Sequence, residues 1–74
     1  MQPHDTPSVE SLAEECRAKR ERLELLKASH RVGQTSYEAL TAAAREFCAA
    51  FDRYHRAKHG KPKRLDYRYV IRSL

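Results

Sequence analysis

The chain has 74 residues, of which 41% are hydrophobic and 34% are charged, and its formal net charge is +5. A chain of this length folds as one domain at most, and it hides only about 60% of its unfolded surface. The apolar content is too high for a fully disordered chain, and no stretch approaches the roughly 20 apolar residues of a membrane span.

The first seven residues, MQPHDTP, lack the basic and apolar regions of a secretory signal peptide. We therefore expect residues 1–7 to form a flexible leader and residues 8–74 to form a single helical domain. The expected location is cytoplasmic, where Cys16 and Cys48 stay reduced.

Residues 8–29 have the pattern of a first amphipathic helix. Thr6, which is followed by proline, is one possible N-cap, and Ser8 is a competing one. Apolar side chains then recur with heptad-like spacing at Val9, Leu12, Ala13, Cys16, Leu23 and Leu26. Gly33 is the expected helix-stop residue.

Residues 36–59 have the clearer helical signature. Thr35 and Glu38 form a capping box in which Thr35 is the expected cap. Apolar side chains follow at steps of three and four without a break, at Tyr37, Leu40, Ala44, Phe47, Phe51 and Tyr54. Gly60 ends the pattern, and Pro62 prevents it from resuming.

A connection of about six residues predicts that the two helices are antiparallel neighbours. Folding the chain around Gly33 pairs positions whose numbers add up to about 66. This register matches Leu26 with Leu40, Leu23 with Ala43, Arg20 with Phe47 and Leu12 with Tyr54. Lys19 and Arg20 interrupt the apolar stripe of the first helix, so their aliphatic stems are expected to cover one step of it.

The second helix is apolar over roughly 180° of its circumference, whereas a single neighbouring helix needs a stripe of only about 100°. Ala39 lies on one edge of this arc, Phe47 at its centre and Cys48 toward the other edge. The helix must therefore contact something besides its partner in the hairpin. The C-terminal segment, a second copy of the chain and a different protein are the candidates.

Residues 65–74 fit two patterns. Alternation of apolar and polar side chains is typical of a strand, whereas Asp66 as an N-cap followed by Tyr67, Val70 and Ile71 indicates a helix. A lone strand beside two helices would leave its backbone groups without partners. We therefore predict a short helix over residues 66–73, and an all-α fold in which it packs across the hairpin.

The two cysteines fall at nearly the same level of the predicted hairpin. A disulfide between Cys16 and Cys48 requires Cα atoms within about 7 Å. A reducing compartment favours the alternative, in which both are buried thiols that act as small hydrophobic groups.

Two histidines, His55 and His59, have the i, i+4 spacing of metal ligands, and His4 of the leader could approach the same end of the hairpin. Solvated histidines beside a basic segment are the simpler interpretation, so we expect no metal site. No glycine-rich phosphate loop occurs, and a chain of this size has little concave volume. We expect neither catalytic activity nor a cofactor.

Positive charge is concentrated toward the C-terminus. From Arg53 onward, eight Lys or Arg residues oppose one acid, a net +7, whereas residues 1–52 carry seven bases and nine acids, a net −2. Such asymmetry indicates an anionic partner, or else a solubilising end. Bases with interleaved tyrosines suit contact with nucleic-acid phosphates and bases, but a third helix of two turns is too short for a helix-turn-helix reader.

A protein-binding surface is the other candidate. Leu25 lies about 180° from the seam of the first helix, and it adds to the wide apolar arc of the second helix and to four tyrosines. A symmetric homodimer, together with the third helix, could instead cover these apolar groups. The predicted partner-binding residues are Leu25, Arg53, Arg56, Arg64, Tyr67, Arg68, Tyr69 and Ile71.

About half the chain, residues 35–74, resembles small proteins encoded on integrative and conjugative elements of rhizobia, most specifically the QseM-type antiactivators. The likeness rests on size, on the capped alanine-rich helix and on the ending GKPKRLDYRYVIR. It implies a helical protein that binds a LuxR-type transcriptional activator, and a second activator of element excision, without contacting DNA. The basic end would then complement an acidic patch on the activator. The expected function is therefore that of a non-enzymatic antiactivator, and a small basic nucleic-acid-binding protein is the alternative.

Overall fold

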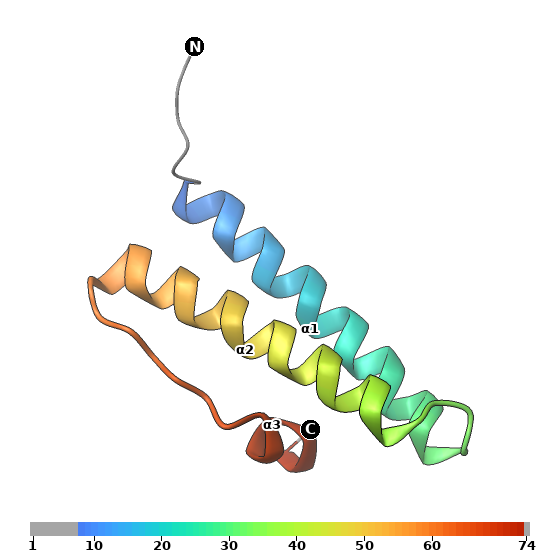
Figure 1. Cartoon of the computed structure of the whole chain (residues 1–74). Helices are drawn as coiled ribbons and strands as arrows, with labels where there is room; N and C mark the ends of the chain where they lie inside the picture. The colour runs from blue at the N-terminus through green and yellow to red at the C-terminus, as the bar shows by residue number, and fades with distance from the viewer. Residues whose placement is uncertain (1–7, 74) are drawn as a thin grey trace.

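The computed structural model describes residues 8–73, which fold into three α-helices and contain no strand. Helix α1 spans Val9–Arg31, α2 spans Tyr37–His59 and α3 spans Tyr67–Ser73. α1 and α2 form an antiparallel hairpin, and α3 lies against α2 (Figure 1). The predicted all-α hairpin with a short third helix is confirmed, whereas the predicted leader, residues 1–7, lies outside the described residues. No helix in the described part of the chain is both long and apolar enough to cross a membrane.

Helix α1 begins after Ser8, whose side-chain oxygen accepts a hydrogen bond from the backbone N–H of Ser11 at 3.0 Å. The competing cap, Thr6, lies outside the described residues. The helix ends at Arg31, two residues later than predicted. Gly33 follows with a φ of 80°, a left-handed conformation that favours glycine over any residue with a Cβ atom.

The N-cap of α2 is Ser36, so the prediction that Thr35 caps this helix is wrong. The Ser36 side-chain oxygen accepts a hydrogen bond from the backbone N–H of Ala39 at 3.1 Å. The hydroxyl of Thr35 instead donates to the hydroxyl oxygen of Ser29 at 2.6 Å. That bond crosses the turn, so Thr35 links the start of α2 to α1, and Ser36 caps the helix.

Ion pairs across the hairpin agree with the predicted register. Lys19 Nζ lies 3.1 Å from Glu46 Oε1, and Arg53 lies 2.8 Å from Glu15 Oε2. Both pairs lie on the same flank of the α1–α2 interface, since Glu46 and Arg53 are seven residues apart on α2. Their residue numbers add up to about 66, as the matching of apolar positions required.

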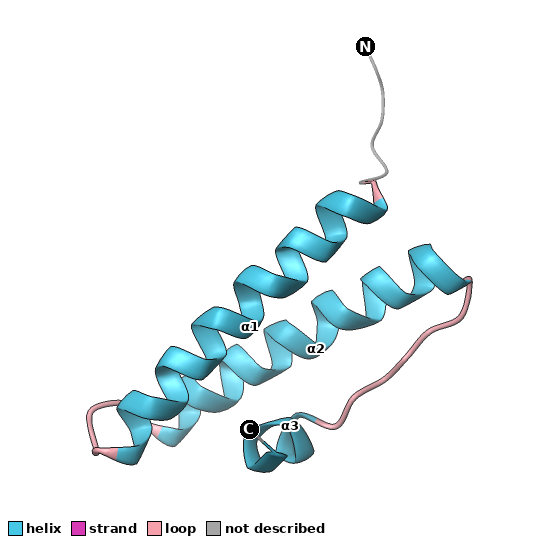
Figure 2. Ribbon diagram, turned by 180° about the vertical axis from the view of Figure 1, so that it is seen from behind, coloured by secondary structure: helices cyan, strands magenta, loops and turns pink. Residues whose placement is uncertain are grey.

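Residues 60–66 form a linker that returns along α2 (Figure 2). It starts at Gly60, the predicted stop of α2, which has a φ of 74° and caps the helix in the left-handed conformation. The backbone N–H of Lys63 donates to Asp52 Oδ1 at 2.9 Å, and this bond fixes the middle of the linker to α2.

The C-terminal segment is a helix, as predicted, and the strand alternative is excluded for the described residues. Asp66 acts as its cap, because its Oδ1 accepts a hydrogen bond from the backbone N–H of Arg68 at 3.0 Å. Its carbonyl oxygen also accepts from the N–H of Val70 at 3.1 Å. Val70, Tyr67 and Ile71 of this helix pack in or against the cluster that contains Phe47, so α3 covers part of the over-wide apolar arc of α2.

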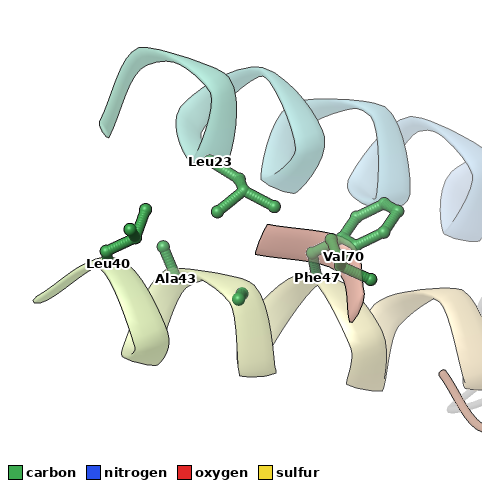
Figure 3. Close-up of a cluster of buried hydrophobic side chains, with 6 residues drawn as sticks. Leu23, Leu40, Ala43, Phe47 and Val70 are labelled. Carbon is green, nitrogen blue, oxygen red and sulfur yellow. The ribbon is translucent and has the colours of Figure 1, made fainter. Parts of the chain in front are cut away.

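The core is small and contains residues from all three helices. Its buried cluster consists of Leu23, Leu40, Ala43, Ala44, Phe47 and Val70. Figure 3 shows Val70 of α3 beside Phe47 of α2, with Leu23 of α1 pointing toward the same space. The two alanines present little side-chain volume, so the helices approach closely there. Lys27 of α1 adds a polar link to α3, because its ammonium donates to the carbonyl oxygen of Val70 at 3.2 Å.

Candidate functional site

An open hollow of about 270 Å³ lies between α1 and α2. We call it the α1–α2 groove, and its lining consists of Ala13, Cys16, Arg17, Arg20, Phe47, Phe51 and Tyr54. Phe47 also belongs to the core cluster that contains Val70, and Phe51 packs against that cluster. The groove is therefore continuous with the apolar surface on which α3 lies.

The groove stays open because α3 is short. At 1.5 Å per residue, the seven residues of α3 span about 10 Å, whereas the 23 residues of α2 span about 35 Å. The third helix can cover only a fraction of the apolar arc of α2. The part that α3 leaves uncovered includes the half-buried Phe51 and Tyr54, which follow the buried Phe47 along α2.

One rim of the groove carries two arginines of α1. Arg20 Nε lies 3.3 Å from Glu24 Oε2, and the Arg17 guanidinium lies 4.0 Å from a Glu14 carboxylate oxygen. In both pairs the side chains are at least half exposed. Exposed pairs within one helix contribute little to stability, so both guanidinium groups are free to exchange these acids for a partner's carboxylates.

The linker supplies further positive charge. Lys61, Lys63 and Arg64 are exposed, and no carboxylate of residues 8–73 lies within 4.0 Å of their charged groups. Burial of the ring is the largest cause that lowers the pKa of His55, and the charges of His59 and then Lys63 lower it further, which places Lys63 near this histidine. The basic linker therefore lies near the end of the groove.

Aromatic rings continue the groove along α2. The centroids of Phe51 and His55 are 4.8 Å apart, and those of His55 and His59 are also 4.8 Å apart. The i, i+4 histidine pair thus extends an aromatic row. Within residues 8–73 no group of three His, Cys, Asp or Glu side chains is arranged to hold a metal ion, and His4 lies outside this range.

Both cysteines are free, half-buried thiols, so the predicted alternative of a disulfide does not occur. Burial is the main cause that raises the pKa of Cys16, and it does the same for Cys48. Thiols whose pKa is raised stay protonated at neutral pH and are poor nucleophiles. Cys16 lies in the lining of the groove, where it acts as a small apolar group.

The apolar residues predicted to bind a partner occupy different surfaces. Leu25 is 72% exposed and lies about 200° around α1 from the buried Leu23, which places it on the outer face of the hairpin. Tyr69 is 62% exposed on α3. Tyr67 and Ile71 are half-buried and pack against the core cluster.

The four predicted arginines are also dispersed. Arg53, Arg56 and Arg68 are exposed and lie 2.8 Å, 3.1 Å and 3.6 Å from carboxylate oxygens of Glu15, Asp52 and Asp66. Arg64 lies on the linker. Tyr67, Arg68, Tyr69 and Ile71 thus lie together on α3, Arg64 lies on the linker before it, and Leu25 lies on the outer face of α1.

The sequence prediction missed the α1–α2 groove as a site. The sequence indicates that the arc centred on Phe47 contacts something besides the first helix, but it does not name Phe51 or Tyr54 among the partner-binding residues. The signal was present in the sequence: an apolar arc of roughly 180° on a helix of 23 residues cannot be covered by a third helix of two turns.

Comparisons with known proteins assign neither a family nor a function to this chain. No protein-family model, no curated protein and no solved structure matches the chain. The function must therefore be inferred from the groove, its basic rims and the exposed surface around α3.

Proposed function

We propose that this chain is a small non-enzymatic regulatory protein that binds a protein partner through the α1–α2 groove. The observation that carries the proposal is the open hollow between α1 and α2, which is lined by the half-buried Phe51 and Tyr54 and by one side of the buried Phe47. A contiguous apolar surface with a charged rim is typical of a protein-interaction site. Aromatic residues with adjacent arginines are also the side chains that contribute most to protein–protein binding.

The chemistry of the groove favours binding over catalysis. Its volume of about 270 Å³ is slightly below the range of about 300–1,000 Å³ that is typical of small-molecule sites. Cys16 lies in the lining, but burial raises its pKa, so the thiol predominates over the nucleophilic thiolate at neutral pH.

In its most specific form, the proposal is that the partner is a transcriptional activator that the protein sequesters. The resemblance of residues 35–74 to QseM-type antiactivators suggests a LuxR-type activator. The basic linker is suited to an acidic patch on such a protein. On this proposal the protein acts in the cytoplasm and regulates quorum-sensing or mobile-element transfer genes.

The test is a transcriptional reporter driven by a LuxR-type activator of the host, with and without co-expression of the full chain. The expected result is a several-fold lower reporter signal, together with co-purification of the activator that survives nuclease treatment. An unchanged reporter signal and no co-purification with any such activator would contradict antiactivation.

A second candidate is a nucleic-acid-binding protein that uses Lys61, Lys63 and Arg64. Its support is the absence of carboxylates within 4.0 Å of these charged groups among residues 8–73. It predicts duplex or single-stranded DNA binding that weakens by roughly 10³-fold or more between low and moderate salt. Glutamine at all three positions should abolish that binding, and lack of retention on DNA at low salt would eliminate this candidate.

A further inference from the structure

We infer that the α1–α2 groove binds an acidic amphipathic helix of the partner, which completes a three-helix bundle beside α3. The inference rests on the proposed function in one respect, namely that the partner is a protein. It adds the secondary structure and the charge of the partner segment that the groove takes up. Three features of the molecule support it.

The first feature is α3 itself, which shows how this surface accepts a helix. Val70 is only 5% exposed and belongs to one cluster with Leu23 and Phe47 (Figure 3). The Lys27 ammonium donates to the Val70 carbonyl oxygen from the α1 side. A helix is therefore held by an inserted aliphatic side chain and a basic side chain of α1, and a partner helix could use the same combination farther along the hairpin.

The second feature is the spacing of the aromatic side chains. Phe47, Phe51 and Tyr54 follow one another at steps of four and three residues, so they form a row along one side of α2. Grooves of this kind take up the apolar face of an amphipathic helix through residues at i, i+3 or i+4, and i+7. The hollow of about 270 Å³ suits the insertion of side chains rather than the enclosure of a ligand.

The third feature is the charge on both sides of the row. Arg17 and Arg20 line the α1 side. On the other side, the linker is tied to α2 by the hydrogen bond from the Lys63 N–H to Asp52. Lys63 lies near His55, whose ring is in tilted contact with that of Phe51. A partner helix with carboxylates on both edges of its apolar face would meet positive charge on each side, which speeds association and selects against basic helices.

A second copy of the chain is a poorer occupant of the groove. Each copy carries a formal net charge of +5, and a two-fold contact between grooves would bring the Arg17 and Arg20 rims of both copies together. Juxtaposed like charges disfavour such a contact. An acidic segment of a different protein meets no such repulsion.

The test uses the full chain and three labelled peptides of about 20 residues. The first is a designed amphipathic helix with leucines on one face and glutamates elsewhere, the second has lysine in place of each glutamate, and the third scrambles the acidic peptide. Fluorescence anisotropy measures binding, and circular dichroism measures the helix gained. We expect the acidic helix to bind, with affinity that falls as salt rises, and the other two peptides to bind at least tenfold more weakly.

A matched pair of charge reversals on α1 locates the bound peptide. Arg20→Glu alters the rim of the groove, whereas Arg22→Glu alters an exposed residue on a different face of the same helix. We expect Arg20→Glu to weaken binding of the acidic helix about fivefold or more, and Arg22→Glu to leave it within twofold. Helix content should be the same in both variants. Equal effects of the two reversals would overturn the inference.

A thiol footprint gives a readout that does not depend on a variant. Cys16 lies in the lining of the groove, whereas Cys48 does not. A bound acidic helix should slow alkylation of Cys16 several-fold and change that of Cys48 much less. The same footprint, measured on the complex with a co-purified activator, separates the two proposals. An activator that binds while Cys16 stays fully reactive would leave antiactivation standing and would refute the groove as the binding site.

Two further outcomes are decisive. If the acidic helix binds and protects Cys16 but no activator co-purifies, the groove inference stands and antiactivation fails. If Cys16 becomes protected in the chain alone as the protein concentration rises, a second copy occupies the groove and the inference fails.

Discussion

The ammonium group of Lys27 on α1 donates a hydrogen bond to the main-chain carbonyl oxygen of Val70 on α3, across 3.2 Å. The two residues are 43 positions apart in the sequence. Val70 is buried in the core, and its carbonyl lies near the C-terminal end of a helix, where a cation is favoured. The pair therefore links α1 to a helix that otherwise packs mainly on α2.

Replacing Lys27 with methionine should loosen α3 while the hairpin persists. Methionine keeps an aliphatic chain but has no donor, so the Val70 carbonyl loses its bond from α1. The expected loss is about 1–2 kcal/mol, the range between a neutral and a charged hydrogen bond. Hydrogen exchange of the α3 amides should accelerate more than that of α2. Arg22→Met, at an exposed position on the same helix, is the control and should change neither quantity.

Leucine-to-alanine substitutions at two positions of α1 should differ sharply in cost. Leu23 is fully buried in the core cluster, and Leu25 is 72% exposed. Leu23→Ala should lower the free energy of unfolding by about 2–5 kcal/mol, which would unfold a large share of a domain this small. Leu25→Ala should stay within about 0.5 kcal/mol of the parent. Urea denaturation followed by circular dichroism measures both, and similar losses would show that the α1–α2 register is wrong.

Ser36→Ala and Thr35→Ala should differ in how their stability costs combine with that of Ser29→Ala. Ser36→Ala should cost about 1 kcal/mol through the lost cap of α2, and this cost should add to that of Ser29→Ala. Thr35→Ala should cost a similar amount but couple to Ser29→Ala, because the two hydroxyls are hydrogen-bonded at 2.6 Å. Denaturation of the single and double variants gives the coupling. A coupling for Ser36 in place of Thr35 would reverse the assignment of the cap.

Much of this fold could be predicted because its determinants are local. The unbroken steps of three and four residues from Tyr37 to Tyr54 define α2, and Gly60 stops it in the left-handed conformation. Asp66 caps α3 as its sequence position suggested. The cap of α2 could not be predicted as securely, because adjacent Thr35 and Ser36 both carry a hydroxyl group that can cap a helix. In the folded chain the Thr35 hydroxyl bonds to Ser29 across the turn, and the Ser36 hydroxyl caps the helix.

The candidate site was less predictable because it depends on where α3 docks. The sequence indicates that α3 should cover α2, but its position along α2 is set by the length of the linker and by the hydrogen bond from Lys63 to Asp52. That position leaves Phe51 and Tyr54 uncovered. The sequence prediction places Leu25 and Tyr69 in one partner-binding set, although they are exposed on different helices and belong to different surfaces.

The two thiols should make the fold less stable as the solution becomes alkaline. Burial is the main cause that raises the pKa of Cys16 in the folded chain, and Asp66 adds to burial at Cys48. The unfolded chain therefore loses its thiol protons first, from a pH near the ordinary value of about 8.5. Above that pH it binds fewer protons than the folded chain, so the free energy of unfolding falls until the folded thiols also ionise.

Lys27 has the opposite effect on the free energy of unfolding, over an overlapping range of pH. Burial is the main cause that lowers its pKa in the folded chain, so the unfolded chain binds the extra proton below the ordinary value of about 10.4. The contribution of Lys27 to the free energy of unfolding therefore rises with pH in that window. The double variant Cys16→Ala, Cys48→Ala removes the thiol contribution and keeps that of Lys27.

Urea denaturation at a series of pH values from 7 to 10 should therefore separate the two effects. The parent chain should lose more stability between pH 8.5 and 10 than the variant without cysteines, whose curve should be flatter or rise. Iodoacetamide should also modify both thiols more slowly in the folded chain at pH 8.5 than in urea, because the thiolate is the reactive form. Parallel curves for the two chains would show that the thiols are solvated, and the packing described around Cys16 and Cys48 would then be wrong.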